Sequence, residues 1–218
     1  MGILEDKARA RVFYRYLSRI YDRINPLVWT EQMRDAAIDQ LDLAPDDTVL
    51  DVGCGTGFAT EGLLDHVDFV HGLDQSVHQL SKAVSKLDQD RVALYRGDAE
   101  RLPFRSNTFD VVWSSGSIEY WPDPVATLRE LRRVGRPGGE VLVVGPDAPD
   151  SRIARALANA IMLFYDEEEA DRMFAAAGFT EVSHIVQQAH PGSPRAITTI
   201  ARIPDDHETE SAAAETVV

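Results

Sequence analysis

The sequence has 218 residues, and its 36 acidic side chains against 22 basic ones give a formal net charge of -14. This charge repels a phosphate backbone, so we expect no nucleic-acid partner. The single cysteine, Cys54, excludes an internal disulfide, and no apolar run has membrane-spanning length, so we expect a cytoplasmic protein.

Lysine is rare among the basic residues, because only Lys7, Lys82 and Lys86 are lysines and the rest are arginines. An acidic, lysine-poor surface is typical of proteins in a high-salt cytoplasm. There, net charge maintains solubility although salt of about 1 M screens charges to within about 3 Å. We interpret the composition as halophilic, with a GC-rich genome as the alternative explanation.

The first predicted element is a basic amphipathic helix over residues 4–24, followed by a break at Asn25-Pro26 and a second helix to about residue 41. We expect residues 1–44 to form a helical lid. This lid either lies on a membrane surface or packs on the domain with its basic side chains in solvent. The basic side chains recur every fourth residue on one side of the helix, at Arg11, Arg15, Arg19 and Arg23.

The next element is a buried strand that ends in glycines at every second position. The spacing differs from the dinucleotide fingerprint Gly-x-Gly-x-x-Gly, and the loop lacks the lysine of a phosphate-binding loop. A cofactor without phosphates, with an amino acid headgroup near an acid, fits this loop, and S-adenosylmethionine (SAM) has those properties. The expected cofactor-binding residues of the loop are Asp51, Gly53, Cys54, Gly55 and Gly57.

Further polar residues stand where later strands end. Asp74 ends the next predicted strand, 21 positions after Gly53, at about the offset where an acid binds ribose hydroxyls. After the third strand, a carboxylate and a backbone amide are placed to bind adenine, and a serine follows the fourth strand. We therefore expect further cofactor contacts from Asp74, Gln75, Asp98, Ala99 and Ser114.

These strands alternate with helical stretches, which predicts an α/β fold with a doubly wound, mostly parallel, seven-stranded sheet. We expect strands near residues 48–52, 69–73, 92–95, 109–113 and 140–144, with a last strand over 195–202. An acid-rich helix over 166–177 should end at Gly178, so we interpret Glu167 to Glu169 as helix electrostatics rather than a metal site. The domain should span 45–203, with a disordered tail over 204–218.

Over residues 45–145 the chain resembles the class I SAM-dependent methyltransferases, and the Pro137-Gly138-Gly139 turn ahead of a strand is also typical of them. The resemblance implies that the glycine loop holds the methionine part of SAM. It further implies that Asp74 holds the ribose, that Asp98 and Ala99 hold the adenine, and that S-adenosylhomocysteine is the product.

Other stretches resemble a narrower family, the 2-methyl-6-phytyl-benzoquinol methyltransferases. The most specific stretch is Ser117-Ile118-Glu119-Tyr120-Trp121-Pro122-Asp123-Pro124; other stretches lie in residues 13–31, 73–80 and 162–169. This resemblance implies methylation of a ring carbon of a prenylated quinol. For a halophilic archaeon we expect a menaquinone-type naphthoquinol as the acceptor, and a benzoquinol otherwise.

For catalysis, a base would deprotonate a ring hydroxyl and push electron density onto the ring. We expect Glu119 to be this base and Tyr120 to line the ring pocket. His190 or His78 is an alternative base, and Glu119 is alternatively a capping carboxylate. No side chains have metal-ligand spacing, so no metal is expected. The competing functions are methylation of a soluble small molecule and non-catalytic SAM binding.

Overall fold

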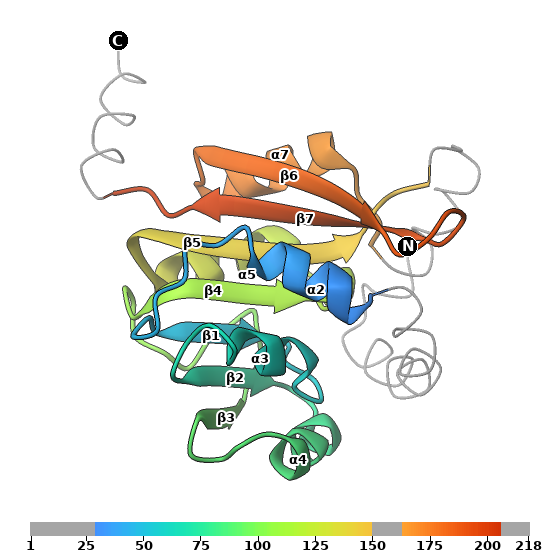
Figure 1. Ribbon diagram of the computed structural model, residues 1–218. Helices are drawn as coiled ribbons and strands as arrows, with labels where there is room; N and C mark the ends of the chain where they lie inside the picture. Colours follow the sequence, from blue (N-terminus) through green and yellow to red (C-terminus); the bar gives the residue numbers. More distant parts are fainter. Residues whose placement is uncertain (1–28, 150–162, 206–218) are drawn as a thin grey trace.

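The structure is a computed structural model that describes residues 29–149 and 163–205. The predicted helix over 4–24 lies outside these residues, as does most of the expected tail. A seven-stranded sheet forms the centre, in the order β3-β2-β1-β4-β5-β7-β6 (Figure 1). Its strands are β1 (Val49–Val52), β2 (Val70–Asp74), β3 (Val92–Arg96), β4 (Phe109–Ser115), β5 (Gly135–Pro146), β6 (Glu181–Gln188) and β7 (Arg195–Arg202).

Only β7 runs against the other strands, since it pairs antiparallel with both β5 and β6, while β1 to β5 pair in parallel. The expected mostly parallel, doubly wound sheet is therefore confirmed. The carboxyl ends of β1, β2, β4 and β5 consequently meet at one edge, which is where ligands bind in such sheets.

Helices cover both faces of the sheet, because alternate side chains of each strand point to opposite sides. On β5, Leu142 and Val144 belong to the apolar core that includes side chains of α2, α3 and α4, whereas Val141 and Val143 belong to the core that includes side chains of α5 and α7. The two apolar cores are therefore separated by the sheet. The helices are α2 (Glu31–Ile38), α3 (Phe58–Leu63), α4 (Val77–Lys86), α5 (Pro124–Val134) and α7 (Glu167–Ala177).

The acid-rich helix is confirmed as α7, with Asp166 as its N-cap and Gly178 as its left-handed C-cap. The Asp166 side chain accepts a hydrogen bond from the Glu169 amide, and Glu169 returns one to the Asp166 amide. This capping box satisfies amides that would otherwise be unpaired in the first turn. Glu168 also pairs with Arg172 at 2.5 Å, so the acidic run stabilises the helix as predicted.

Two features of the sheet differ from the prediction. Strand β6 was not predicted, and it forms the edge of the sheet beside β7. The expected Pro137-Gly138-Gly139 turn lies within β5, where the pairing with β4 jumps from Gly135 to Glu140. Gly138 has a φ of +77°, so the turn is present as an irregularity that interrupts the strand.

Within the predicted lid, α2 packs directly on the domain. Arg34 is buried, donates a hydrogen bond to the Phe58 carbonyl at 3.0 Å, and lies 4.9 Å from the centre of the Phe58 ring. Gly62 leaves the space that the guanidinium fills. Helix α2 therefore anchors α3 just after the glycine loop. None of the helices in the described part of the chain is long and apolar enough to span a membrane.

Candidate functional site

The glycine loop after β1 has a backbone that only glycine adopts easily. Gly53, Gly55 and Gly57 have φ values of +77°, +55° and +84°. A Cβ on Gly53 would lie 2.6 Å from the Ser117 Cβ, in the segment after β4. The loop therefore brings bare backbone against the segment that follows β4, at the carboxyl edge of the sheet.

Asp74 holds this loop in place from the end of β2. One of its oxygens accepts a hydrogen bond from the Gly55 amide at 2.9 Å, and the other accepts from the Ser76 amide at 2.7 Å. Burial raises the pKa of Asp74, and the two backbone hydrogen bonds oppose this shift. Each carboxylate oxygen has a further lone pair, so Asp74 keeps the capacity to accept from ribose hydroxyls. Its ribose contact stays a prediction.

Asp51 lies at the end of β1, with only 1% of its surface exposed. It accepts a hydrogen bond from the Thr60 hydroxyl at 2.6 Å, which ties β1 to α3. Burial raises the pKa of Asp51 to about 7, against the lowering effect of its hydrogen bonds with Thr60. A cationic group beside the carboxyl would favour the ionised form. The site is therefore suited to an ammonium group.

Cys54 is buried inside the glycine loop, where its sulfur packs toward Gly72 of β2. Burial raises the pKa of the thiol, so it stays protonated at neutral pH. Such a thiol is neither a nucleophile nor a redox centre. The side chain therefore fills a small space within the loop, and a contact of Cys54 with a cofactor stays a prediction.

The other predicted cofactor residues fall into two groups. Gln75 and Asp98 are exposed in the segments after β2 and β3, and the Asp98 side chain accepts from the Glu100 amide at 3.1 Å. Ala99 packs partly against the core. Ser114 is different, because it is fully buried and donates to the Val52 carbonyl at 2.7 Å. It links β4 to β1, and its contact with a cofactor stays a prediction.

One residue of this region was missed as a site residue, although its motif was recognised. The Ser117 hydroxyl lies 2.6 Å from the Ser114 hydroxyl, and its Cβ faces Gly53. The available signal was the glycine before it. Gly116 directly follows β4 and has a φ of +61°, so the chain turns there and Ser117 lies beside the glycine loop.

The predicted catalytic residues lie in the short 3-10 helix η2 (Ile118–Tyr120), just after β4. Glu119 has only 1% of its surface exposed, whereas Tyr120 is half-buried at the edge. Trp121 packs into the core rather than lining an open pocket. The structure therefore places Glu119 at the expected edge but beneath the surface.

Tyr165 was overlooked by the sequence reasoning, and it lies beside η2. It is fully buried just before α7, and its hydroxyl has no hydrogen-bond partner among the described residues. Burial raises its pKa, and the Glu119 and Asp147 carboxylates raise it further. The available signal was the place of this tyrosine directly before the Asp166 N-cap, because a hydrophobic residue at that position often packs against the beginning of the helix.

The alternative bases occupy exposed positions. His78 lies in the first turn of α4, and His190 lies in the turn between β6 and β7. Strand β7 begins beside the end of β5, where Ala196 pairs with Pro146. The turn with His190 is therefore near the carboxyl edge, but His190 is exposed whereas Glu119 is buried.

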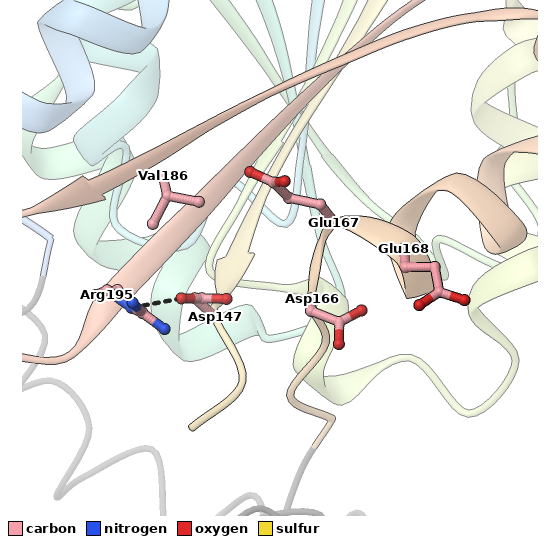
Figure 2. A pocket seen from close by; sticks show the side chains of 6 residues that line it. All are labelled: Asp147, Asp166, Glu167, Glu168, Val186 and Arg195. Carbon is pink, nitrogen blue, oxygen red and sulfur yellow. Dashed lines mark ion pairs between the residues drawn. The ribbon is translucent and has the colours of Figure 1, made fainter. Parts of the chain in front are cut away.

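A pocket of about 400 Å³ opens near the end of β5 and the start of α7 (Figure 2). Arg195 reaches across it to Asp147, with 2.6 Å between the guanidinium nitrogen and the carboxylate oxygen. The pocket is not formed by the glycine loop; it is lined by Asp147, Asp166, Glu167, Glu168, Val186 and Arg195. Within residues 29–149 and 163–205, no group of three His, Cys, Asp or Glu side chains is placed to hold a metal ion.

The sequence is similar to known proteins over this same region. Residues 50–143, from β1 to β5, match the family described as a methyltransferase domain. In fold, the chain is similar to phosphoethanolamine N-methyltransferase 2 of Haemonchus contortus, solved with phosphomonomethylethanolamine and S-adenosylhomocysteine. The TM-score is 0.68 at 16% identity, covering 81% of this chain and 53% of that one.

Two relatives are similar in sequence. The 2-methyl-6-phytyl-1,4-hydroquinone methyltransferase 1 of Oryza sativa is 47% identical over 183 residues, which cover 82% of this chain and 56% of the rice protein. The chain thus spans just over half the length of that relative. The demethylmenaquinone methyltransferase of Staphylococcus saprophyticus is 28% identical over 209 residues, which cover 81% of this chain and 90% of that protein.

Proposed function

We propose that the chain, which matches the methyltransferase-domain family over residues 50–143, transfers a methyl group from SAM to a ring carbon of a prenylated quinol. The observation that carries the proposal is the joining of two regions at one edge. A bare glycine loop with buried Asp51 and half-buried Asp74 lies beside η2, whose sequence is the most specific part of the resemblance to quinol methyltransferases.

The residues of the glycine loop fit SAM. Gly53 packs against Ser117 too closely for any side chain, and the Asp51 carboxyl, with its pKa of about 7, would be held ionised by an ammonium group. In this proposal Asp51 holds the amino acid part of SAM, Asp74 holds the ribose hydroxyls, and Asp98 with the Ala99 amide holds the adenine. When bound, SAM supplies a methyl group that is already activated on a sulfonium.

With an activated methyl group, the remaining task of the protein is to align and activate the acceptor. Holding the ring carbon in line with the methyl group converts a bimolecular step into an effectively unimolecular one. We assign Glu119 as the base that removes the proton of a ring hydroxyl, with half-buried Tyr120 against the ring.

The two relatives support the class of acceptor, because their names specify a phytyl hydroquinone and demethylmenaquinone. Both acceptors combine a quinone-type ring with a long apolar chain. We propose a menaquinone-type naphthoquinol as the acceptor, with a benzoquinol as the second possibility. The chain spans just over half of the rice relative, so the proposed acceptor rests on the ring chemistry that the two names share.

The setting of the reaction is part of the same proposal. An acceptor with an apolar tail resides in a bilayer, so we place the protein in the cytoplasm at the inner face of the membrane. The basic segment over 4–24 would make the contact. A high-salt cytoplasm is proposed on the lysine-poor composition and the net charge of -14.

The test is methyl transfer from SAM that carries a trideuterated methyl group, followed by mass spectrometry of the extracted lipids. The full chain is incubated with reduced demethylmenaquinol, with 2-methyl-6-phytylhydroquinone and with a soluble phenol, at low and at molar salt. We expect label in a prenylated quinol and none in the phenol. Label only in the phenol would favour a soluble acceptor, and SAM binding without any product would favour a non-catalytic protein.

A further inference from the structure

The Tyr165 hydroxyl is a buried polar group that the surrounding protein does not satisfy. The residue has 0% of its surface exposed, and the hydroxyl has no hydrogen-bond partner in the described part of the chain. An unsatisfied buried donor is destabilising, and such groups in native proteins call for an explanation such as catalysis or positioning. Phenylalanine would fill the same space without this cost.

The backbone around Tyr165 holds the ring where it is. The Tyr165 amide donates to the Pro146 carbonyl at 3.4 Å, and its carbonyl accepts from the Ala148 amide at 3.1 Å. Two residues earlier, the Leu163 amide donates to the Glu119 carbonyl at 3.4 Å. Residues 163–165 are therefore attached both to the end of β5 and to η2.

The space for the hydroxyl is provided by a glycine at the end of β5. A Cβ on Gly145 would lie 2.6 Å from the Tyr165 hydroxyl and 2.5 Å from the Ile118 Cγ2. The hydroxyl thus lies over bare backbone, next to the residue that precedes Glu119. Two carboxylates act on it electrostatically, those of Glu119 and Asp147. Asp147 is held by Arg195 at 2.6 Å, and Glu119 directly follows Ile118, whose side chain lies over the same glycine as the hydroxyl, so we take Glu119 as the acceptor.

We propose that Tyr165 is a positioning residue for Glu119: its hydroxyl donates a hydrogen bond to the Glu119 carboxylate when a quinol occupies the site. The bond would hold the base ionised and oriented toward the ring hydroxyl. This inference rests on the proposed function, because it assigns a partner to the base of that reaction. In this proposal Tyr165 acts through Glu119 and does not itself contact the acceptor.

The first test is the pH profile of methyl transfer by Tyr165→Phe, which removes only the hydroxyl. A hydrogen bond donated to a carboxylate favours the charged form, so its loss raises the pKa of the base. The acid limb of kcat should therefore move to higher pH by about one unit, which is about a tenfold loss of rate below the midpoint. KM for the quinol should not change. A profile that coincides with the wild type would overturn the inference.

The second test compares thermal unfolding of two Tyr→Phe variants. The Tyr95 hydroxyl lies 3.2 Å from the His71 Nδ1, so Tyr95→Phe removes a hydrogen bond at the opposite end of the sheet and should lower Tm. Tyr165→Phe removes a hydroxyl without a protein partner and should leave Tm unchanged or higher. An equal drop in Tm for both variants would show that the Tyr165 hydroxyl is structural, which contradicts the proposal.

A double variant separates this inference from the function on which it rests. In a Glu119→Gln background, Tyr165→Phe should cause no further loss of rate, because the partner is already changed. A further loss of the same size as in the wild type would overturn the pairing, although methyl transfer itself would stand. Absence of quinol methylation by the wild type would instead overturn the proposed function, and this inference with it.

Discussion

The glycine-loop region and the acceptor region meet at the same edge of the sheet but are built differently. In the glycine-loop region, residues 49–57 with Asp74, the two acids accept hydrogen bonds from backbone amides and from the Thr60 hydroxyl. In the acceptor region, defined here by Glu119, Gly145 and Tyr165, a buried hydroxyl has no partner among the described residues. The acids of the first region therefore form hydrogen bonds within the protein without a ligand, whereas in the second region one polar group has no such bond.

This difference separates binding from turnover. A preformed loop binds its ligand with little reorganisation, so damage to it should appear in the affinity for SAM. A region that is completed only with the acceptor bound should contribute to the reaction step instead. Changes in the two regions should therefore be distinguishable by measuring SAM affinity and methyl transfer separately.

The largest effect is expected from Gly53→Ala in the glycine-loop region. The residue has a φ of +77°, and the new Cβ would lie 2.6 Å from the Ser117 Cβ. A left-handed backbone costs about 1–2 kcal/mol, and overpacking adds about 1–3 kcal/mol. We expect the affinity for SAM, measured by isothermal titration calorimetry, to fall about a hundredfold or more.

Gly192→Ala is the matched control for this substitution. Gly192 has a φ of +91°, but nothing lies within 4 Å of the position that its Cβ would take. This variant carries the backbone strain without the clash, so SAM affinity should stay close to that of the wild type. If both variants bound SAM equally well, the close approach at Gly53 would not matter for the cofactor.

Glu119→Gln should show the opposite pattern in the acceptor region. Loss of a general base lowers the rate by about a hundredfold or more, because such a base contributes a factor of about 10² to 10⁴. SAM affinity should change less than about twofold, since Glu119 lies outside the glycine loop. Quinol methylation and SAM titration measured on the same sample would check both statements.

Glu130→Gln provides the control for this change. Glu130 accepts from the Leu102 amide at 2.9 Å and pairs with Arg133 on α5, away from the site. Its substitution should lower stability without a comparable loss of kcat. A hundredfold loss of kcat in this variant as well would show that the Glu119 effect is not specific to the base.

Asp74→Asn should cause a smaller loss of SAM affinity than Gly53→Ala. Asparagine keeps one oxygen for the backbone amides of Gly55 and Ser76 but loses the charge and the second acceptor. Hydrogen bonds to a charged group contribute about 1.5–3 kcal/mol, so we expect affinity to fall about ten- to a hundredfold. Equilibrium binding of SAM measures this directly.

Asp110→Asn tests whether any strand acid would give the same result. Asp110 accepts from the Thr48 amide at 2.8 Å and pairs with Arg136, but it lies at the amino end of β4. We expect this change to reduce stability and to leave SAM affinity unaltered. Equal losses of affinity for both variants would contradict the assignment of Asp74 to the cofactor.

The last effect is on stability rather than on SAM binding or rate, and it concerns the pH dependence of the free energy of unfolding through Asp51. The folded protein keeps this proton up to about pH 7, whereas the ordinary pKa is 3.8. Between these values the folded state binds more protons, so this group's contribution to the free energy of unfolding falls as pH rises, by about 1.4 kcal/mol per unit. The free energy of unfolding would be measured with urea at intervals of about one pH unit, from about pH 4.5 to about pH 7.5. It should vary less with pH in Asp51→Asn than in the wild type.

The exposed Asp46 serves as the reference for that measurement. Asp46→Asn should reproduce the wild-type profile, because it changes a carboxyl group that lies in solvent. If Asp51→Asn had the same profile as Asp46→Asn, burial of Asp51 would not control its ionisation.

The glycine-loop region could be predicted from the sequence because its chemistry is local. Gly53, Gly55 and Asp51 lie within five residues of one another, and Asp74 ends the next strand. Alternation of apolar strands and helices predicted the sheet, and β7 was predicted with its observed bounds, Arg195–Arg202. In both cases, short-range pattern decides the structure.

The acceptor region could not be predicted in the same way, because its contacts join distant residues. Tyr165, Gly145 and Glu119 come together only through the packing of residues 163–165 between η2 and β5. Strand β6 was missed for a related reason. Its alternation is irregular, since Ile185 and Val186 are adjacent, and its pairing with β7 rather than its own pattern makes it a strand.

The most direct measurement of the central claim is the position of the transferred methyl group. The product formed from trideuteromethyl SAM and a prenylated quinol would be fragmented by tandem mass spectrometry, with Glu119→Gln as the control. The account predicts that the label lies on a ring carbon and that the control forms far less product. Label on a ring oxygen, or equal labelling by the control, would contradict it.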